Sequence, residues 1–465
     1  MVGSKIQLFA IGPQDFHLTG NPQITFFKSV FRRHTNFTKD IRKIHFLGGA
    51  PSFGDDGAIA KITQDGDLLS NVYLEATITG MSNKLGAYTI NHFGNSLIKK
   101  VELEIGGYII DTHYSQWMQI YDELTDNTCV NQQPASGLKG GLYTDMNFTH
   151  DFDSSKININ NRINADSPLV FGGSIKNENI SSGFNASNNT HTNYKKKFIV
   201  PLKFWFTKTP GLYLPICALY NHTVNLKFTF EEKHKLIGNS TNITSLTESF
   251  RVYGEYIHLE DEEKRRFSQS NHEYIIEQVQ LNNNSHVITS STTDSSLDNA
   301  NTLVKVDYEL NFKNPIKYFT WVIVNEGINS TTLSDNSGQG PCYFVSQCSN
   351  SIYGNDGTDG TIELLLDGVE REMELPVFYY TRLYPKKYCK NIPDLDRIGL
   401  YSFALNPFDV EPSGTCNFSK INDKNIKIAF ANNNINNISG KKLYFFGVNY
   451  NVLIITDGMA VVRYS

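Results

Sequence analysis

The sequence has few charged side chains and no long apolar run. Only 19% of its 465 residues are Asp, Glu, Lys or Arg, and the formal net charge is −5. Such a weakly acidic chain is not suited to coating nucleic acid, which needs a strongly basic surface. No apolar stretch approaches the roughly 18 residues that a membrane-spanning helix needs. The low charged fraction is typical instead of a protein that hides much of its surface in an assembly.

Cysteine is scarce and its spacing is unpatterned. The six cysteines are Cys129, Cys217, Cys342, Cys348, Cys389 and Cys416. They form no C-x-x-C pair and no zinc-type spacing with histidine, so we expect no metal site. Cys342 and Cys348 are close enough in sequence to form a disulfide, but two free thiols in a reducing compartment are the expected state.

Known catalytic motifs are also absent from the sequence. It contains no P-loop, no H-E-x-x-H motif, no G-x-S-x-G elbow and no kinase signature. The segment from Asn355 to Gly360 is acidic and glycine-rich, yet it lacks the spacing and the terminal glutamate of a calcium loop. A turn is the expected structure there. We therefore expect no enzyme activity, no catalytic residue and no cofactor.

The N-terminus lacks the usual signals for secretion or lipidation. The apolar run from Ile6 to Ile11 is short and is followed by Gly12 and Pro13, without a small-residue cleavage site. Val2 stands where N-myristoylation needs glycine. We expect neither a signal peptide nor a myristoyl anchor.

The sequence is rich in β-strand patterns. With 30 Phe and 24 Tyr in 465 residues, the composition favours strands, and the length favours two or more domains. Apolar and polar residues alternate over Val101–Ile105, Val224–Phe230, Val304–Phe312 and Val448–Ile454. No long helical pattern separates these strands, which excludes a parallel βαβ sheet and predicts antiparallel sandwiches.

A short repeat relates the two halves of the chain. Val101–Gly107 (V-E-L-E-I-G-G) aligns with Ile362–Gly368 (I-E-L-L-L-D-G) at an offset of 261 residues. Each copy predicts a strand that ends in a hairpin turn with positive φ, supplied by Gly-Gly or Asp-Gly. The repeat supports duplication of one sandwich fold.

Between the halves, the charge order from Glu260 to Ser270 predicts a short helix. Acidic residues stand at its start and basic residues near its end, as the helix dipole favours. The first half then closes with a strand over Phe250–Leu259, and the second opens with a strand over Glu273–Leu281.

Two long polar segments predict surface loops. They cover Thr125–Lys197 and Gly327–Gly360 and are rich in Asn, Ser and Gly, a composition that cannot build a core. The first contains N-x-S/T sequons that are candidate glycosylation sites, namely Asn179, Asn185 and Asn188. Asparagine is so abundant that sequons are expected by chance.

The segment from Asp15 to Phe37 predicts a short helix with a strongly apolar, aromatic face. Asn21 can cap it, and Pro22 at the first helical position has its φ already set. Ile24, Phe27 and Phe31 then fall on one face, with Phe26 and Val30 beside them. Because so short a helix is marginal in water, its aromatic face needs a surface, on its own domain or elsewhere.

This segment lies in a basic region. Residues 1–43 hold seven Lys or Arg against two Asp, a net charge of +5. The cations are Lys5, Lys28, Arg32, Arg33, Lys39, Arg42 and Lys43. Arg32 and Arg33 fall where cations offset the negative end of the expected helix.

Several ordered segments resemble one protein family. L-T-G-N-P-Q-I-T-F-F-K-x-V-x-R-R-x-T-N-F resembles the N-terminal signature of the double jelly-roll major capsid proteins of nucleocytoplasmic large DNA viruses. Further similar blocks are Asn91–Leu124, Pro201–Phe230, Tyr256–Gln280, Tyr401–Ser419 and the C-terminal G-V-N-Y-N-V-L-I-I-T-D-G-M-A. The block over Tyr401–Ser419 contains the second-domain signature residues Pro412, Ser413, Gly414, Asn417 and Phe418. Five or six matches in order are far more specific than any one alone.

The resemblance implies an all-β fold of two consecutive antiparallel eight-stranded jelly-roll sandwiches, a double jelly roll, with short helices and long surface loops. The expected domains are an N-terminal arm (1–23), a first jelly roll (24–259), a linker helix (260–270) and a second jelly roll (271–465).

It also implies a function. The expected protein is a structural major capsid protein whose pseudo-hexagonal homotrimeric capsomers tile the icosahedral shell of a large dsDNA virus. Its partners would be itself, neighbouring capsomers, minor capsid and penton proteins and the internal viral membrane, without sequence-specific nucleic-acid binding. We expect it in the virion, made and assembled in the host cytoplasm.

Within this interpretation, Ile24, Phe27 and Phe31 are expected to dock against the base of a jelly roll. The basic residues Arg32, Arg33, Lys39, Arg42 and Lys43 are expected to face the particle interior. The anionic partners there would be an internal membrane, acidic minor capsid proteins or packaged DNA.

The alternative is a β-sandwich protein that binds or processes carbohydrate. Trp117, Trp205 and Trp321 could then serve as stacking platforms for sugar rings. Each tryptophan lies within an apolar segment (Q-W-M, F-W-F and T-W-V), however, and this pattern predicts core positions.

Overall fold

The structure is a computed structural model that describes residues 6–29, 31–81, 93–125, 194–236, 247–282, 286–287, 303–324, 360–390, 398–431 and 442–464. The chain divides into an N-terminal unit, Met1–Phe37, and a main unit, Thr38–Ser465. Within the described ranges, no helix is long and apolar enough to span a bilayer.

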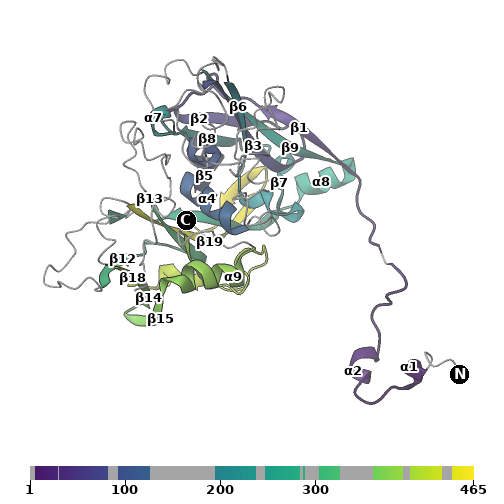
Figure 1. The fold of residues 1–465 in the computed structure, drawn as a ribbon. Coiled ribbons are helices and arrows are strands. Elements are labelled where there is room, and N and C mark those ends of the chain that lie inside the picture. The colour runs from purple at the N-terminus through teal and green to yellow at the C-terminus, as the bar shows by residue number, and fades with distance from the viewer. Residues whose placement is uncertain are drawn as a thin grey trace, which may run out of the picture. The chain divides into compact units, whose positions relative to one another are not determined.

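Two sheets form the first half of the main unit (Figure 1). One sheet has the order β1-β9-β3-β6, with bounds Phe37–Ile44, Thr247–Leu259, Leu68–Met81 and Tyr194–Pro201. The short strand β7 (Leu214–Pro215) also pairs with β3. The other sheet has the order β2-β8-β4-β5, with bounds Asp56–Ile62, Val224–Phe230, Ile98–Ile105 and Tyr108–Tyr114.

The second half repeats this topology. One sheet has the order β10-β19-β13-β16, with bounds His272–Leu281, Lys442–Thr456, Pro315–Val324 and Ile398–Ser402. Three short strands join it: β11 (His286–Val287), β17 (Cys416–Asn417) and β20 (Met459–Val462). The other sheet has the order β12-β18-β14-β15, with bounds Leu303–Glu309, Lys424–Ala431, Thr361–Leu366 and Val369–Pro376.

In each half, the first long strand lies beside the last one, and the second beside the second-to-last. This interleaved antiparallel order is that of a jelly roll, so the chain folds as a double jelly roll. Colour in Figure 1 separates the first half (purple to teal) from the second (green to yellow).

The repeated hairpins confirm the duplication predicted from the sequence. Gly106 and Gly107 have φ of 60° and 86° between β4 and β5, and Asp367 and Gly368 have φ of 50° and 75° between β14 and β15. Positive φ at both central residues is the turn that suits the twist of a two-residue hairpin. Both hairpins also change register at the same step, between residues 103 and 104 and between residues 364 and 365.

The helices are short. They are α1 (Ile6–Phe9), α2 (Phe16–Thr19), α3 (Phe93–Leu97), α4 (Ser115–Thr125), α7 (Lys233–Leu236), α8 (Asp261–Gln269) and α9 (Tyr384–Tyr388). Single turns are η5 (Trp205–Thr207), η6 (Pro210–Leu212), η7 (Ile216–Ala218), η12 (Tyr379–Leu383) and η13 (Phe418–Lys420). α4 follows β5, and η12 with α9 follows β15, so the helical segments occupy equivalent places in the two halves.

The helix predicted between the halves is present as α8. Asp67, in the turn before β3, fixes its position. One carboxylate oxygen lies 2.8 Å from Lys264 Nζ on α8, and the other accepts a hydrogen bond from the backbone N–H of Leu259 at 2.9 Å. The ion pair with Lys264 thus joins α8 to the first jelly roll.

Each half has a buried apolar core, and the three tryptophans belong to these cores. Trp117, Trp205 and Trp321 are 3%, 1% and 0% exposed. Trp321 packs in the core of the second sandwich, whereas Trp117 and Trp205 pack in the core of the first. None of the three can stack on a sugar at the surface, which removes the observation that favoured the carbohydrate alternative.

Two predicted boundaries are wrong. β12 ends at Glu309, although Leu310 and Phe312 beyond it are buried. The loop expected up to Lys197 ends earlier, because β6 begins at Tyr194 and its lysines pair along β3. The start of β6 is set by backbone pairing with β3, and its polar side chains give no strand pattern in the sequence. The rest of that loop (126–193), with its three candidate sequons, and most of the second loop (325–359), with Cys342 and Cys348, lie outside the described residues.

The helix predicted from Pro22 is also wrong. The described residues from Pro22 to Asn36 contain no helix, and Asn21 has a left-handed φ of 52° where a cap would need extended backbone. The short helix α2 ends at Thr19, before the predicted one begins. Helix nucleation is costly, and a helix this short is marginal unless burial of its apolar face repays that cost.

Candidate assembly surfaces

The aromatic segment of the N-terminal unit is exposed in the single chain. Ile24 is 73% exposed, Phe26 89%, Phe27 98% and Phe31 84%. Arg32 and Arg33 beside them are exposed as well. So much uncovered apolar surface in one short segment is a feature of surfaces that bind a partner.

The three predicted basic residues after this segment belong to the main unit. Lys39, Arg42 and Lys43 lie on β1, an edge strand whose residues from 38 to 43 are largely exposed. Lys39 Nζ is 3.6 Å from a Glu255 carboxylate oxygen, and Arg42 Nε donates to Asp40 at 2.5 Å. Lys43 lines a shallow cavity of about 210 Å³.

The second-domain signature is a tight loop that supports the sheet. The Ser413 hydroxyl accepts from the Asn406 N–H at 2.9 Å and donates to the Asn406 carbonyl at 3.2 Å. Gly414 has φ +141°, and a Cβ there would lie 2.7 Å from the Phe403 carbonyl oxygen. Pro412 before them is exposed. These residues shape the loop that leads into β17.

The end of the signature anchors this loop in the core. The Asn417 side chain accepts from the Ser419 N–H at 3.1 Å and so caps the η13 turn. Phe418 is fully buried in the second core, and its N–H donates to the Asn314 carbonyl at 3.1 Å. The signature residues Asn417 and Phe418 therefore have a packing role in the second jelly roll.

The two jelly rolls share an extensive apolar junction. The outer face of the β10-β19-β13-β16 sheet is apolar and merges with the core of the first sandwich. Aromatic pairs bridge the junction, with ring centroids 6.1 Å apart for Tyr114 and Phe446 and 5.8 Å apart for Trp205 and Tyr274. The second jelly roll therefore buries both faces of this sheet, one on its own core and one on its neighbour.

Strand β5 of the first jelly roll also contacts β10 of the second through hydrogen bonds. Asp111 Oδ1 accepts from the Val279 N–H at 2.9 Å, and the Gln278 side-chain amide donates to the Ile110 carbonyl. The other Asp111 oxygen lies 2.8 Å from His113 Nε2. These residues fix how the strands of the two sandwiches meet.

A buried charge cluster occupies the same junction. Glu277 on β10 contacts Lys208 of the first jelly roll and lies 2.8 Å from Lys317 Nζ on β13. Lys317 is fully buried, donates to the Asp409 carbonyl at 2.7 Å and sits 5.0 Å from the centre of the Tyr450 ring.

The electrostatics of this cluster follow from burial and pairing. Burial alone would raise the pKa of Glu277, but Lys208 and Lys317 outweigh it and hold that pKa below its ordinary value. Burial lowers the pKa of Lys317 despite Glu277, whereas Glu277 raises the pKa of Lys208 despite burial. One carboxylate thus stabilises two ammonium groups at the boundary between the sandwiches.

The C-terminal hairpin is hydrogen-bonded to the first jelly roll. The Asn221 N–H donates to the Gly458 carbonyl at 3.1 Å, and the Asn221 side chain donates to the Asp457 carbonyl at 2.8 Å. The Ala460 N–H donates to His222 Nδ1 at 3.1 Å. The turn between β19 and β20 is therefore part of the junction.

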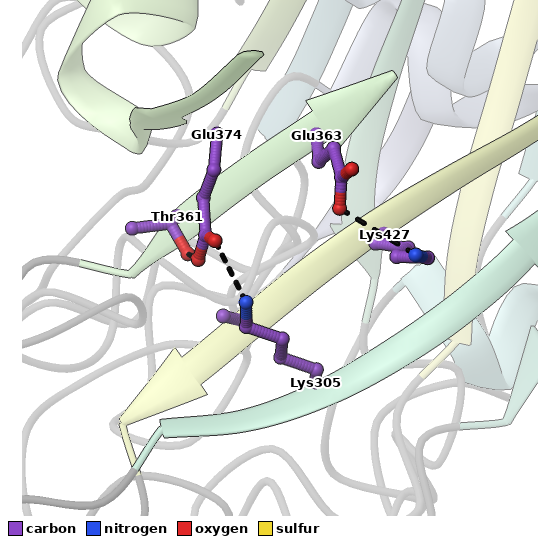
Figure 2. A pocket seen from close by; sticks show the side chains of 6 residues that line it. Lys305, Thr361, Glu363, Glu374 and Lys427 are labelled. Carbon is purple, nitrogen blue, oxygen red and sulfur yellow. Dashed lines mark hydrogen bonds and ion pairs between the residues drawn. The ribbon is translucent and has the colours of Figure 1, made fainter. Parts of the chain in front are cut away.

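The second jelly roll also carries a polar face, shown in Figure 2. Lys305 Nζ lies 2.7 Å from Glu374, and Lys427 Nζ lies 3.6 Å from Glu363. Thr361 donates to Glu374 at 2.5 Å. This surface is an ion-pair network over β12, β18, β14 and β15 without room for a ligand. Among the described residues, there is no group of three or more His, Cys, Asp or Glu side chains that could hold a metal ion.

Sequence comparisons agree with this duplicated architecture. The model for "Major capsid protein N-terminus" matches residues 25–260, and that for "Large eukaryotic DNA virus major capsid protein" matches residues 263–461. The chain belongs to the family of large eukaryotic DNA virus major capsid proteins. Its role is therefore structural and not catalytic, its place is the capsid of the virion, and it associates with itself in the shell.

Individual relatives cover the whole chain. It is 31% identical to the major capsid protein of Pyramimonas orientalis virus over 487 residues, with 100% of both chains covered. It is 30% identical to the major capsid protein of Paramecium bursaria Chlorella virus 1 over 499 residues, again with full coverage of both.

Solved structures show the same fold. VP54 of PBCV-1 matches with a TM-score of 0.68 and 26% identity, covering 95% of this chain and 100% of that one. The Faustovirus major capsid protein matches with a TM-score of 0.58 at 13% identity, covering 96% and 94%. The second likeness supports the fold alone.

Sequence reasoning missed the charged part of the junction. Lys317 follows Ile316 and precedes Y-F-T-W-V, and a single lysine inside so apolar a strand is a signal for a buried ion pair. No sequence signal identifies Lys208 as its neighbour, because the two residues are brought together only by the packing of the two jelly rolls.

Proposed function

We propose that this chain forms homotrimeric, pseudo-hexagonal capsomers that tile the icosahedral shell of a large dsDNA virus. The observation that carries the proposal is the duplicated sandwich: three chains with two similar jelly rolls each present six similar units around a ring. The proposed domains are an arm (1–23), jelly rolls at 24–259 and 271–465, and a linker helix at 260–270. The end of β9 at Leu259 and the start of β10 at His272 support the boundaries of the linker helix between the two jelly rolls.

The N-terminal unit is proposed to act beneath the capsomer. Ile24, Phe27 and Phe31 would dock at the base of a jelly roll, and their exposure in the single chain leaves them available for this contact. Arg32 and Arg33 would then face an anionic inner layer, which is an internal membrane, acidic minor capsid proteins or packaged DNA. Near an anionic membrane each cation contributes on the order of 1 kcal/mol.

Further partners in this proposal are neighbouring capsomers, minor capsid proteins and penton proteins, with synthesis and assembly in the host cytoplasm. Self-association and the virion location follow from the family, and the proposal extends them to the other components of a closed shell.

Light scattering on the purified chain tests the oligomer. We expect three times the chain mass at micromolar concentration, since obligate interfaces usually bury more than about 2,000 Å². A monomeric mass with the fold intact, as judged by circular dichroism, would contradict the proposal.

The arm is tested separately. Phe27→Ala with Phe31→Ala should lower the melting temperature of the trimer, and a chain that lacks residues 1–36 should show a loss at least as large, because it lacks both aromatic rings. Equal melting of the trimer with and without the two substitutions would show that the segment docks elsewhere.

A further inference from the structure

The first described residues of the N-terminal unit form two helical turns, α1 and α2, which we call together the terminal apolar segment (residues 6–19). The Ala10 N–H donates to the Ile6 carbonyl at 2.9 Å, and the Asp15 N–H donates to the Gly12 carbonyl at 3.0 Å. The Asp15 carboxylate accepts in return from the Gly12 N–H at 2.9 Å. Contacts within the segment therefore hold its shape.

Most of the large apolar side chains in this segment are uncovered. The exposed fractions are 59% for Ile6, 70% for Leu8, 75% for Phe9, 61% for Ile11, 67% for Phe16 and 85% for Leu18. Apolar side chains gathered so closely at a protein surface are a feature of sites that bind a partner or a membrane.

These side chains do not share one face. In a helix of about 3.6 residues per turn, Ile6 and Leu8 point about 200° apart, and so do Phe16 and Leu18. A protein groove covers one face of a helix, which it recognises by residues three or four positions apart. Acyl chains, in contrast, adapt to side chains on every side. The arrangement therefore fits a lipid environment better than a shaped protein groove.

The charges of the N-terminal unit favour an anionic lipid. Asp15 is the only carboxylate side chain among residues 1–37, and it is used within the turn. Lys28, Arg32 and Arg33 are exposed. Apolar side chains together with nearby cations are typical of segments that lie in the interface of an anionic bilayer. The phosphates of nucleic acid would attract the cations but would leave the apolar side chains uncovered.

We propose that the terminal apolar segment inserts into the interfacial layer of an anionic bilayer beneath the shell, with Lys28, Arg32 and Arg33 at its headgroups. This inference rests on the proposed function and selects the membrane among the three anionic partners named there. The segment is shorter than the roughly 20 residues that a spanning helix needs, so it lies in the interface and does not cross the bilayer.

Vesicle flotation with the full chain tests the insertion. Vesicles of phosphatidylcholine and phosphatidylserine should carry wild-type trimers upward in a density gradient. Phe9→Ser with Phe16→Ser should lower the partition coefficient at least about tenfold, because two aromatic rings no longer leave water. This difference should persist at about 1 M salt, where the screening length is roughly 3 Å and the cations contribute little.

A matched control removes two exposed apolar side chains from the main unit. Tyr108→Ser with Met459→Ser, at positions that are 70% and 46% exposed, should float as the wild type does. If this control loses as much binding as Phe9→Ser with Phe16→Ser, general surface hydrophobicity is the cause and the proposed insertion is wrong.

Fluorescence quenching tests the location of the segment directly. The three native tryptophans are at most 3% exposed, so they contribute little to quenching by lipid. In vesicles with brominated acyl chains, the indole of a Phe9→Trp variant should be quenched, whereas that of a Tyr108→Trp variant should not. Equal quenching of the two variants would contradict insertion through residues 6–19.

The outcomes separate this inference from the proposed function. Wild-type trimers that do not float, with no quenching in the Phe9→Trp variant, would overturn the insertion and leave the proposed function standing. Trimers that do not float but bind double-stranded DNA or polyglutamate, and lose that binding in Phe9→Ser with Phe16→Ser, would overturn it in favour of another partner. A monomeric wild-type chain in light scattering would overturn the proposed function itself.

Discussion

The buried charge cluster at the junction offers the sharpest test of how the two jelly rolls are held together. Glu277→Gln preserves the shape of the side chain but removes the carboxylate that pairs with both Lys208 and Lys317. Lys317 is fully buried, so its charge would remain in the junction with a backbone carbonyl and an aromatic ring as partners. Breaking a buried ion pair from one side typically costs about 3–5 kcal/mol.

This cost predicts a large thermal shift. For a unit of 150–250 residues, such as one jelly roll, each kcal/mol moves Tm by about 2–4 °C, so we expect a loss of about 6–20 °C by calorimetry. Protein concentration must be equal in all samples, because the stability of an oligomer depends on it. The control is Glu273→Gln on the same strand. Glu273 is exposed and 3.9 Å from Arg463, so Glu273→Gln should change the free energy of unfolding by no more than about 0.5 kcal/mol.

The dependence on pH adds a second criterion. Because the folded-state pKa of Glu277 is lowered, its contribution is fully present above the unfolded value of about 4.3 and is lost as pH falls through the lower folded value. The gap between the wild type and Glu277→Gln should be constant from about pH 6 to 8 and narrow only in strong acid. A Glu277→Gln variant that melts within a degree of Glu273→Gln would refute the reasoning.

Three further predictions concern the arm, the first loop and the buried tyrosines. Arg32→Glu with Arg33→Glu should leave the trimer mass unchanged but reduce binding to anionic vesicles in a flotation assay, most at low salt; Lys61→Glu with Lys313→Glu is the control, and equal binding would contradict an anionic partner. Replacing residues 126–193 by a short Gly-Ser linker should keep Tm within a few degrees, and loss of folding would show that the segment is structural. Burial raises the pKa of Tyr256 and Tyr274 to about 12, so stability should fall between about pH 10 and 12 as the unfolded chain loses protons first; a phenolate absorbance titration complete near pH 10 would contradict this.

Much of the fold follows from local sequence. Alternation over Val101–Ile105 and Val224–Phe230 predicts two strands of one sheet, and both are present as β4 and β8. The Gly-Gly and Asp-Gly turns predict the repeated hairpins because positive φ is a local requirement. The charge order of residues 260–270 predicts α8 for a similarly local reason.

The errors arise where contacts between residues far apart in the sequence determine the local structure. The segment from Pro22 has a strong helical pattern, yet amphipathicity stabilises a helix only when its apolar face has a surface to cover. β6 forms through pairing with β3, which lies far earlier in the chain, and its lysine-rich sequence gives no sign of it. The charge cluster is invisible for the same reason, since Lys208 and Lys317 meet only after both sandwiches pack.

The position of β19 has a consequence for the synthesis of the protein. This strand, Lys442–Thr456, pairs with β10, β13 and β20, and the turn after it contacts Asn221. A nascent chain therefore cannot complete the second sandwich, or cover the first, until the ribosome has passed this strand. Chains that terminate earlier lack the strand that joins β10 to β13 and cannot build the junction. Because β19 lies so near the C-terminal end of the described fold, translation of almost the whole chain must precede closure of the second sandwich and of the junction.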